Sequence, residues 1–309
     1  MARHYEKIVL VTRATRLDEL VRRFNTRSQA RFYLEHADQD FEDYVREDDT
    51  YRRALDALHG QLSLGLPVQQ VDRSLVPTFL FGEKDLVVAL GQDGLVANVA
   101  KYVGHQPLVG VNPDPSRFDG VLLPFSVAQS RQAVRQTLES RARWRSVTLA
   151  EVVLSDGQRL VAFNDLFLGA RTHVSARYTL RHGEDTETQS SSGIIVSTGV
   201  GASGWLSSVF NQARGLTRDT GGAPGEDFAL EWEDPRLAFV VREPFVSRHS
   251  SARRVSGFIR AESELVVESR MPSGGVIFSD GVEEDFLAFN AGTTARVHPA
   301  ARRALLIVP

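Results

Sequence analysis

One aspartate stands where its carboxylate could take part in chemistry. Asp93 lies in the segment Gly91-Gln92-Asp93-Gly94, between an apolar run, Leu86 to Leu90, and apolar residues at helical spacing from Val96 to Val103. This pattern predicts a buried strand, a tight loop and a helix. Backbone amides at a helix start favour phosphate, and a carboxylate beside a phosphate could take a proton from an attacking hydroxyl. The same side chain could instead cap the helix by accepting a hydrogen bond from a backbone amide.

A second candidate segment follows the predicted strand Gly193 to Ser197. Residues 198–205 contain three glycines, together with the hydroxyl residues Thr198 and Ser203, and end at Trp205. Glycines allow close backbone approach, and hydroxyls and amides can donate to an anion. Trp205 could stack on a flat ring of a ligand, or it could be a core residue of a tight strand-to-helix turn. We favour a ligand loop, because the run of small residues is longer than a turn needs.

A third candidate is the polar pair Asn164-Asp165, which interrupts the apolar run Ala162 to Phe167. The pair either caps a turn or binds the hydrogen-bonding edge of a ligand, and the sequence favours neither. The chain contains no Walker A lysine motif, no protein-kinase signature and no G-x-S-x-G elbow. The eight histidines lack metal-ligand spacing, and the absence of cysteine excludes thiol catalysis and disulfides.

The elements that must position these residues fall into two halves. In residues 1–145, apolar runs alternate with helical patterns, including surface helices over 28–63 and a helix over 127–145, which predicts an open parallel α/β sheet. From residue 146 onward, short strands separated by hairpin-like turns predict an antiparallel β-rich domain.

Length, composition and charge limit the classes of protein to which the chain can belong. A chain of 309 residues, 42% of them apolar, can bury a large core and is expected to form two domains. Its net charge of −3 gives no reason to expect nucleic acid as a partner. The first apolar run, Ile8 to Val11, is too short for a signal peptide, and no run is long enough to span a bilayer. We therefore expect a soluble cytoplasmic protein with no membrane partner.

These segments together resemble the NAD kinase family of the NAD kinase and diacylglycerol kinase superfamily. Gly91-Gln92-Asp93-Gly94-Leu95 is similar to its Gly-Gly-Asp-Gly-Thr loop, but Gln92 and Leu95 replace the glycine and the threonine. Asn164-Asp165 resembles its Asn-Glu pair, and residues 198–205 resemble its loop Thr-Pro-Thr-Gly-Ser-Thr-Ala-Tyr. The details that look closest to the mitochondrial-type branch are Thr15-Arg16, Gly110-Val111-Asn112, Asp114-Pro115, Ser191-Ser192-Gly193, Trp205 and Arg242-Glu243-Pro244.

The resemblance implies a fold and an activity. The fold would be a Rossmann-like α/β domain of residues 1–145, a β-rich dinucleotide-binding domain of residues 146–289, and a return of about residues 290–309 to the first domain. The activity would be ATP- and Mg²⁺-dependent phosphorylation of the 2′-hydroxyl of NAD to NADP by a homodimer or higher homo-oligomer, with Asp93 as general base. The implied ligand-binding residues are Gly91, Gln92, Gly94, Asn112, Asn164, Asp165, Thr198, Gly201, Ala202, Ser203 and Trp205, and none is a metal ligand.

Two alternatives remain open. One is a kinase for another hydroxyl, on a sugar, a nucleoside or a lipid, in which Gln92 and Leu95 would be adaptations to that acceptor. The other is a dinucleotide-binding regulator that has lost phosphoryl transfer.

Overall fold

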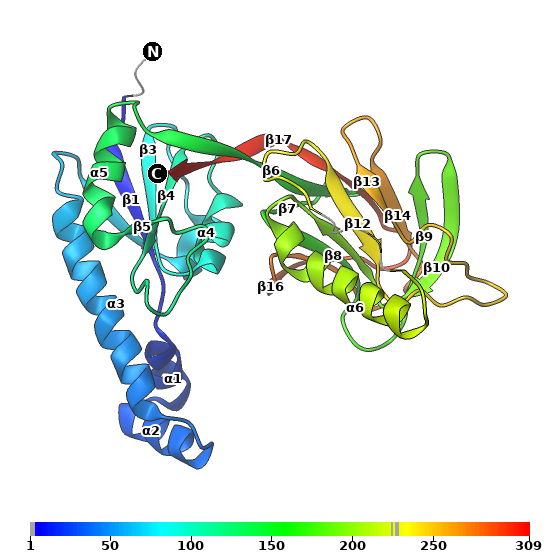
Figure 1. The fold of residues 1–309 in the computed structure, drawn as a ribbon, viewed down its shortest axis with the longest axis horizontal. Helices are drawn as coiled ribbons and strands as arrows, with labels where there is room; N and C mark the ends of the chain where they lie inside the picture. Colours follow the sequence, from blue (N-terminus) through cyan, green and yellow to red (C-terminus); the bar gives the residue numbers. More distant parts are fainter. Residues whose placement is uncertain (1–3, 224, 226–228) are drawn as a thin grey trace. The chain divides into compact units, whose positions relative to one another are not determined.

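The computed structural model of the protein describes residues 4–223, 225 and 229–309. The chain divides into two compact units, Met1–Arg145 with Ala304–Pro309, and Ser146–Arg303 (Figure 1). The first contains a parallel α/β sheet and the second contains antiparallel sheets, so the predicted fold class is confirmed. No helix in the described part of the chain is both long and apolar enough to cross a membrane.

The first unit is built on strands in the order β17-β4-β3-β1-β2, and each pair along this path is parallel. The strands are β1 (Lys7–Thr12), β2 (Val68–Asp72), β3 (Asp85–Leu90), β4 (Pro107–Asn112), β5 (Phe125–Ser126), which pairs with β4, and the end of β17 (Thr294–Val308). Every residue of β3 and β4 is buried, which explains why these strands are continuous apolar runs rather than alternating patterns.

Helices cover both faces of this sheet. The helices of this unit are α1 (Arg16–Phe24), α2 (Arg27–His36), α3 (Phe41–Gln61), α4 (Asp93–Ala100), α5 (Val127–Leu138) and a 3₁₀ turn, η1 (Arg73–Thr78). Of these, α1 and α2 pack against the start of α3 rather than on the sheet. Figure 1 shows α3 and α5 on one side of the sheet and α4 on the other. Tyr51 and Leu58 of α3 and Val134 of α5 enter the core, so α3 is more than the surface helix predicted for this region.

The predicted helix over residues 127–145 is too long. α5 ends at Leu138, Ser140 takes a left-handed conformation with φ 56°, and strand β6 (Arg143–Leu154) has already begun at Arg143. The arginines of this region suit an exposed helix or an exposed strand equally well, so their charge did not mark the boundary.

The second unit is a sandwich of antiparallel strands. One sheet has the order β13-β12-β11-β8-β15-β16, and β9, β10, β14, β6, β7 and the start of β17 form the other layer. The strands are β7 (Arg159–Ala162), β8 (Asp165–Ala170), β9 (Ala176–His182), β10 (Asp185–Ser191), β11 (Ile194–Ser197), β12 (Leu237–Val241), β13 (Ser256–Ile259), β14 (Leu265–Ser269), β15 (Gly275–Ser279) and β16 (Val282–Ala288). Their inward residues share one core that includes Leu168, Val196, Phe239 and Val267.

One helix packs on the outer face of this sandwich. A 3₁₀ turn, η2 (Gly201–Ser203), leads into α6 (Trp205–Asp219). Leu206 of α6 packs with Ile195 and Val240 of β11 and β12. This packing places the loop before α6 at the end of β11.

Candidate functional site

Asp93 is the first residue of α4, directly after the loop that ends β3. The residue before it, Gln92, is extended and makes no side-chain capping bond, and Asp93 does not cap the helix either. Its Oδ1 instead accepts a 2.6 Å hydrogen bond from the backbone N–H of Leu122. The other carboxylate oxygen makes no hydrogen bond within the part of the chain that the structure describes. The capping interpretation of Asp93 is therefore wrong, and one carboxylate oxygen remains available to a ligand.

The two glycines of this loop differ in their surroundings. A Cβ at Gly91 would lie 2.8 Å from Cδ2 of Leu95, which is buried. A Cβ at Gly94 would meet nothing within 4 Å, and Gly94 is exposed. A ligand could thus approach the backbone at Gly94, at the positive end of α4, while Gly91 makes room for a neighbouring side chain of the protein.

Asn112 is committed to a turn of the same unit. Its Oδ1 accepts from the N–H of Asp114 at 2.9 Å, and its Nδ2 donates to the carbonyl of Phe118 at 2.9 Å. Asn112 is also buried. Its predicted contact with a ligand remains a prediction, and the structure shows it holding the 114–118 turn.

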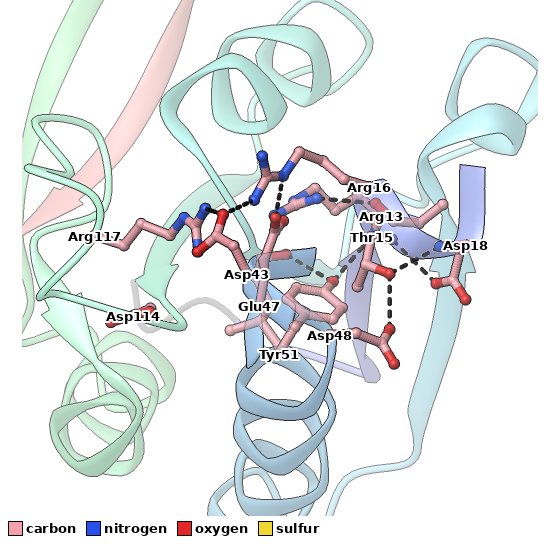
Figure 2. A network of polar contacts seen from close by, with 12 residues as sticks. Arg13, Thr15, Arg16, Asp18, Asp43, Glu47, Asp48, Tyr51, Asp114 and Arg117 are labelled. Atoms are coloured by element: carbon pink, nitrogen blue, oxygen red, sulfur yellow. Dashed lines mark hydrogen bonds and ion pairs between the residues drawn. The ribbon is translucent and has the colours of Figure 1, made fainter. Parts of the chain in front are cut away.

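A network of arginines and carboxylates links the end of β1, helix α3 and the 114–118 turn, and sequence analysis missed most of it (Figure 2). Arg13 and Arg16 both pair with Glu47, and Arg16 and Arg117 both pair with Asp43. The hydrogen bonds from Arg117 and then from Arg16 lower the pKa of Asp43 to about 2. Burial disfavours ionised Glu47, but its two arginine partners outweigh burial and lower its pKa. Asp43 and Glu47 are therefore ionised at neutral pH.

Local interactions fix the network next to the Asp93 loop. Thr15 caps α1 by accepting from the N–H of Asp18, which makes Arg16 the first helical residue. The hydroxyl of Tyr51 accepts from the N–H of Arg13 and donates to the carbonyl of Leu90, so it ties the ends of β1 and β3 together. Two sequence signals were available: Thr15-Arg16 directly after a strand, and the four-residue spacing of Asp43 and Glu47, which places both on one helix face.

In the second unit, Asn164 and Asp165 lie where β8 begins. Thr198 donates its hydroxyl to the carbonyl of Phe163 at 2.6 Å, and its N–H donates to the carbonyl of Asn164 at 2.9 Å. Ser197 pairs with Asp165 across β11 and β8. The structure thus brings together the predicted residues Asn164, Asp165 and Thr198.

The carboxylate of Asp280 holds the same segment from another side. It accepts hydrogen bonds from the N–H groups of Phe163, Asn164 and Asp165 at 3.0, 2.6 and 3.2 Å. Burial, and then the charge of Asp280, raise the pKa of Asp165 to about 7. Sequence analysis did not identify Asp280, although Asp280-Gly281 is a typical hairpin-turn signal.

The glycines of the 198–205 loop contact the protein itself. A Cβ at Gly201 would lie 2.1 Å from the carbonyl oxygen of Asn164, and a Cβ at Gly199 would lie 1.9 Å from that of Glu231. Glycine at position 201 was predicted to let a ligand approach the backbone closely. In the structure, the backbone that lies close to Gly201 is that of Asn164. At Gly204 the nearest atom is the carbonyl oxygen of Gly201 at 3.4 Å, which leaves more space.

The remaining predicted residues of this loop are Ala202, Ser203 and Trp205. Ala202 is buried, whereas Ser203 is exposed. Trp205 is half-buried and stacks on Phe167 with ring centroids 5.7 Å apart, and the guanidinium of Arg242 lies 5.3 Å from its ring centroid. Trp205 packs against the protein, as a core residue would, and it is also partly accessible, as a residue that stacks on a ligand would be.

Comparison with known proteins identifies the fold. No family model matches the sequence, and no curated protein matches it. Among solved structures, yeast NADH kinase complexed with NADH matches with a TM-score of 0.60 and 14% identity, over 99% of this chain and 84% of that one. An NAD kinase from Archaeoglobus fulgidus in complex with ATP matches with a TM-score of 0.54 and 16% identity, over 97% and 93% of the two chains. The chain therefore has the fold of these NAD and NADH kinases.

Proposed function

We propose that the protein is a kinase that transfers the γ-phosphoryl group of ATP to the 2′-hydroxyl of NAD and so produces NADP. The observation that carries the proposal is the position of Asp93 in a fold shared with these kinases. Its carboxylate is fixed through one oxygen by Leu122 and has the other oxygen available, at the start of a helix beyond a parallel strand. Ligands of open α/β sheets bind at this end of the strands.

The proposed reaction uses Asp93 as general base. The acceptor oxygen forms a bond to the γ-phosphorus, the bond from that phosphorus to the β–γ bridging oxygen breaks, ADP leaves, and the hydroxyl proton passes to Asp93. Gly94 is exposed at the start of α4, so a phosphate oxygen could accept a hydrogen bond from the backbone there. Arg16 and Arg117 are partly exposed and belong to a network in which three arginines face two carboxylates, so an excess of positive charge is left to attract a phosphate.

Adenosine and its phosphates would contact the second unit. Asn164 and Asp165 supply polar groups, Thr198 is buried and holds the backbone of this pair, and Ser203 and Gly204 are exposed. Gly201 would contribute indirectly, because it lets the loop lie against the carbonyl of Asn164. Trp205 would border the ligand.

Magnesium would arrive with ATP. Within the described residues no cluster of three or more metal-ligating side chains could hold a metal ion. Mg²⁺ keeps several water ligands and binds substrate phosphates, so an ion that arrives on ATP needs no such cluster, and Asp93 stays free to act as the base. Bound Mg²⁺ would neutralise phosphate charge.

The mitochondrial-type branch, a homodimer or higher homo-oligomer, and a cytoplasmic location complete the proposal. The sequence similarities at Thr15-Arg16, Gly110-Val111-Asn112 and Trp205 support the branch and, through it, the oligomer.

The test is ADP release by the purified protein with ATP, Mg²⁺ and a panel of acceptors: NAD, NADH, sugars, nucleosides and lipids. We expect NAD or NADH to be phosphorylated, with the new ester identified as a 2′-phosphate by phosphorus NMR. Asp93→Asn should lower turnover at least about 10²-fold, because it removes the base. Its free energy of unfolding should change by less than about 1 kcal/mol, because the amide oxygen can still accept from Leu122.

Asp49→Asn is the matched control, since Asp49 is an exposed aspartate of α3 in the same unit. It should leave turnover unchanged. A wild-type protein that is inert toward NAD and NADH but phosphorylates another acceptor would establish the first alternative. Binding of NAD without ADP release from any acceptor would establish the regulator, and unchanged turnover in Asp93→Asn would overturn the role of Asp93.

A further inference from the structure

The turn between β15 and β16 forms hydrogen bonds to residues 163–165, the segment that contains the proposed adenosine-binding pair Asn164-Asp165. Asp280 and Gly281 have φ angles of 54° and 70°, as the two central residues of a tight hairpin require. The carboxylate of Asp280 accepts from the three successive N–H groups of residues 163–165, and its own N–H donates to the carbonyl of Asp165 at 3.0 Å. Because Thr198 holds the carbonyls of Phe163 and Asn164, the backbone of the segment is fixed on both sides.

The side chain of Asp165 is unusual in this setting. It is 91% buried, because its relative exposure is 9%, and it makes no hydrogen bond within the part of the chain that the structure describes. Its strand neighbour, Ser197, cannot supply positive charge, and neither can Thr198. Among the described titratable groups, Asp280 is the one whose charge acts on Asp165, and its negative charge raises the pKa of Asp165. A second buried negative charge so close is unfavourable, so the arrangement favours the neutral acid at Asp165.

We propose that Asp280 is a positioning residue for nucleotide binding: it fixes the 163–165 backbone and, together with burial, keeps Asp165 as a neutral carboxylic acid that donates its proton in a hydrogen bond to the ligand. The ligand atom would be an acceptor, such as a ring nitrogen of adenine. This inference rests on the proposed function, because it takes an adenine nucleotide as the ligand of the second unit.

The charge state of Asp165 makes the inference measurable. Its pKa of about 7 means that the donating form predominates at pH 6 and is a small minority at pH 8.5. If only the neutral form binds well, the affinity for NAD should fall about 30-fold between these two pH values. A carboxylate that accepted a hydrogen bond from a ribose hydroxyl would give the opposite slope.

The experiment is calorimetric titration of the full-length protein with NAD, without ATP, from pH 6 to pH 8.5. The wild type should show the fall in affinity. Asp165→Asn should keep the affinity of pH 6 within a few-fold and lose the pH dependence, because its amide is a permanent neutral donor. Asp280→Asn should weaken binding at pH 6 and move the pH profile to lower pH, because burial alone then raises the pKa of Asp165 and the added negative charge is gone. Asn tolerates the left-handed conformation of residue 280.

Asp156→Asn is the matched control. Asp156 lies in the Asp-Gly turn between β6 and β7, where its carboxylate bonds to Gln158 and not to residues 163–165. This variant should retain the affinity and pH profile of the wild type.

Three results would overturn the inference. The first is an NAD affinity that is flat or rises with pH in the wild type, and the second is a large loss of affinity in Asp165→Asn at pH 6. The third is a folded Asp280→Asn protein with the profile of the wild type. The wild-type and Asp165→Asn profiles decide the matter even if Asp280→Asn fails to fold. A wild type that binds no NAD at any pH would overturn the proposed function and, with it, the inference. A wild type that phosphorylates NAD but shows a flat binding profile would overturn the inference alone.

Discussion

Replacing Gly201 with alanine tests how tightly the two loops of the second unit pack. The new Cβ would lie 2.1 Å from the carbonyl oxygen of Asn164, 2.6 Å from its carbonyl carbon and 2.8 Å from Oγ of Ser197. Two of these three atoms belong to the backbone, so a rotamer change cannot relieve the contact. The loops must separate by about 1 Å to restore van der Waals contact.

The expected cost follows from that separation. Overpacking of this kind costs about 1–3 kcal/mol. The hydrogen bonds of Thr198 to the carbonyls of Phe163 and Asn164 would also lengthen, and each contributes about 0.5–1.5 kcal/mol. We therefore expect Gly201→Ala to lower the free energy of unfolding by about 2–4 kcal/mol. NAD affinity should fall with it, because Asn164 and Asp165 move.

Urea unfolding, followed by far-UV circular dichroism and by tryptophan fluorescence, measures the effect. Gly215→Ala is the control: Gly215 lies within α6, and a Cβ there would meet nothing within 4 Å. It should raise stability by about 0.5–1 kcal/mol through its better helix propensity. A Gly201→Ala protein as stable as the wild type, with NAD affinity unchanged, would refute the packing argument.

Three further predictions concern buried side chains. Leu95→Thr should lower the free energy of unfolding by about 2–3 kcal/mol in urea titrations, because it empties space beside Gly91 and buries a hydroxyl; an unchanged midpoint would contradict this. Asp165 binds its proton more tightly in the folded state, so the stability it contributes should be lost as pH rises from about 4 through about 7. Unfolding curves of Asp165→Asn at pH 5 and pH 8 should lack this loss. Burial opposes ionisation of Glu187, but hydrogen bonds from residues 253, 254 and others outweigh burial and lower its pKa to about 2. The stability that ionised Glu187 contributes to the fold should therefore be present above about pH 4.5 and lost toward pH 2. In acid unfolding, Glu187→Gln should remove this pH dependence of the free energy of unfolding.

Local sequence patterns predicted the elements that carry Asp93. The apolar run Leu86 to Leu90 became the fully buried strand β3, and the helical spacing after it became α4. Such patterns are informative because the period of burial follows directly from strand or helix geometry. The end of α5 was predicted seven residues too late, because the exposed residues between Leu138 and Arg145 carry no burial period.

Residue types at spaced positions also predicted part of the candidate site. Asn164, Asp165 and Thr198 were singled out from sequence, and the structure brings them into contact. The sequence could not tell that Gly201 serves this contact, since a glycine that approaches a ligand and one that approaches the protein look alike.

What only the tertiary structure decided is which distant groups meet. Asp93 bonds to Leu122, Asp43 pairs with Arg117, and Asp280 holds the amides of residues 163–165, across separations of 29, 74 and 115–117 residues. Each partner is chosen by strand order and by the path of the loops, which no local pattern records. Sequence alone therefore determined where strands, helices and reactive side chains occur along the chain. The packing of the fold decided their partners, because hydrogen bonds and charge interactions depend on distances of a few ångströms in space.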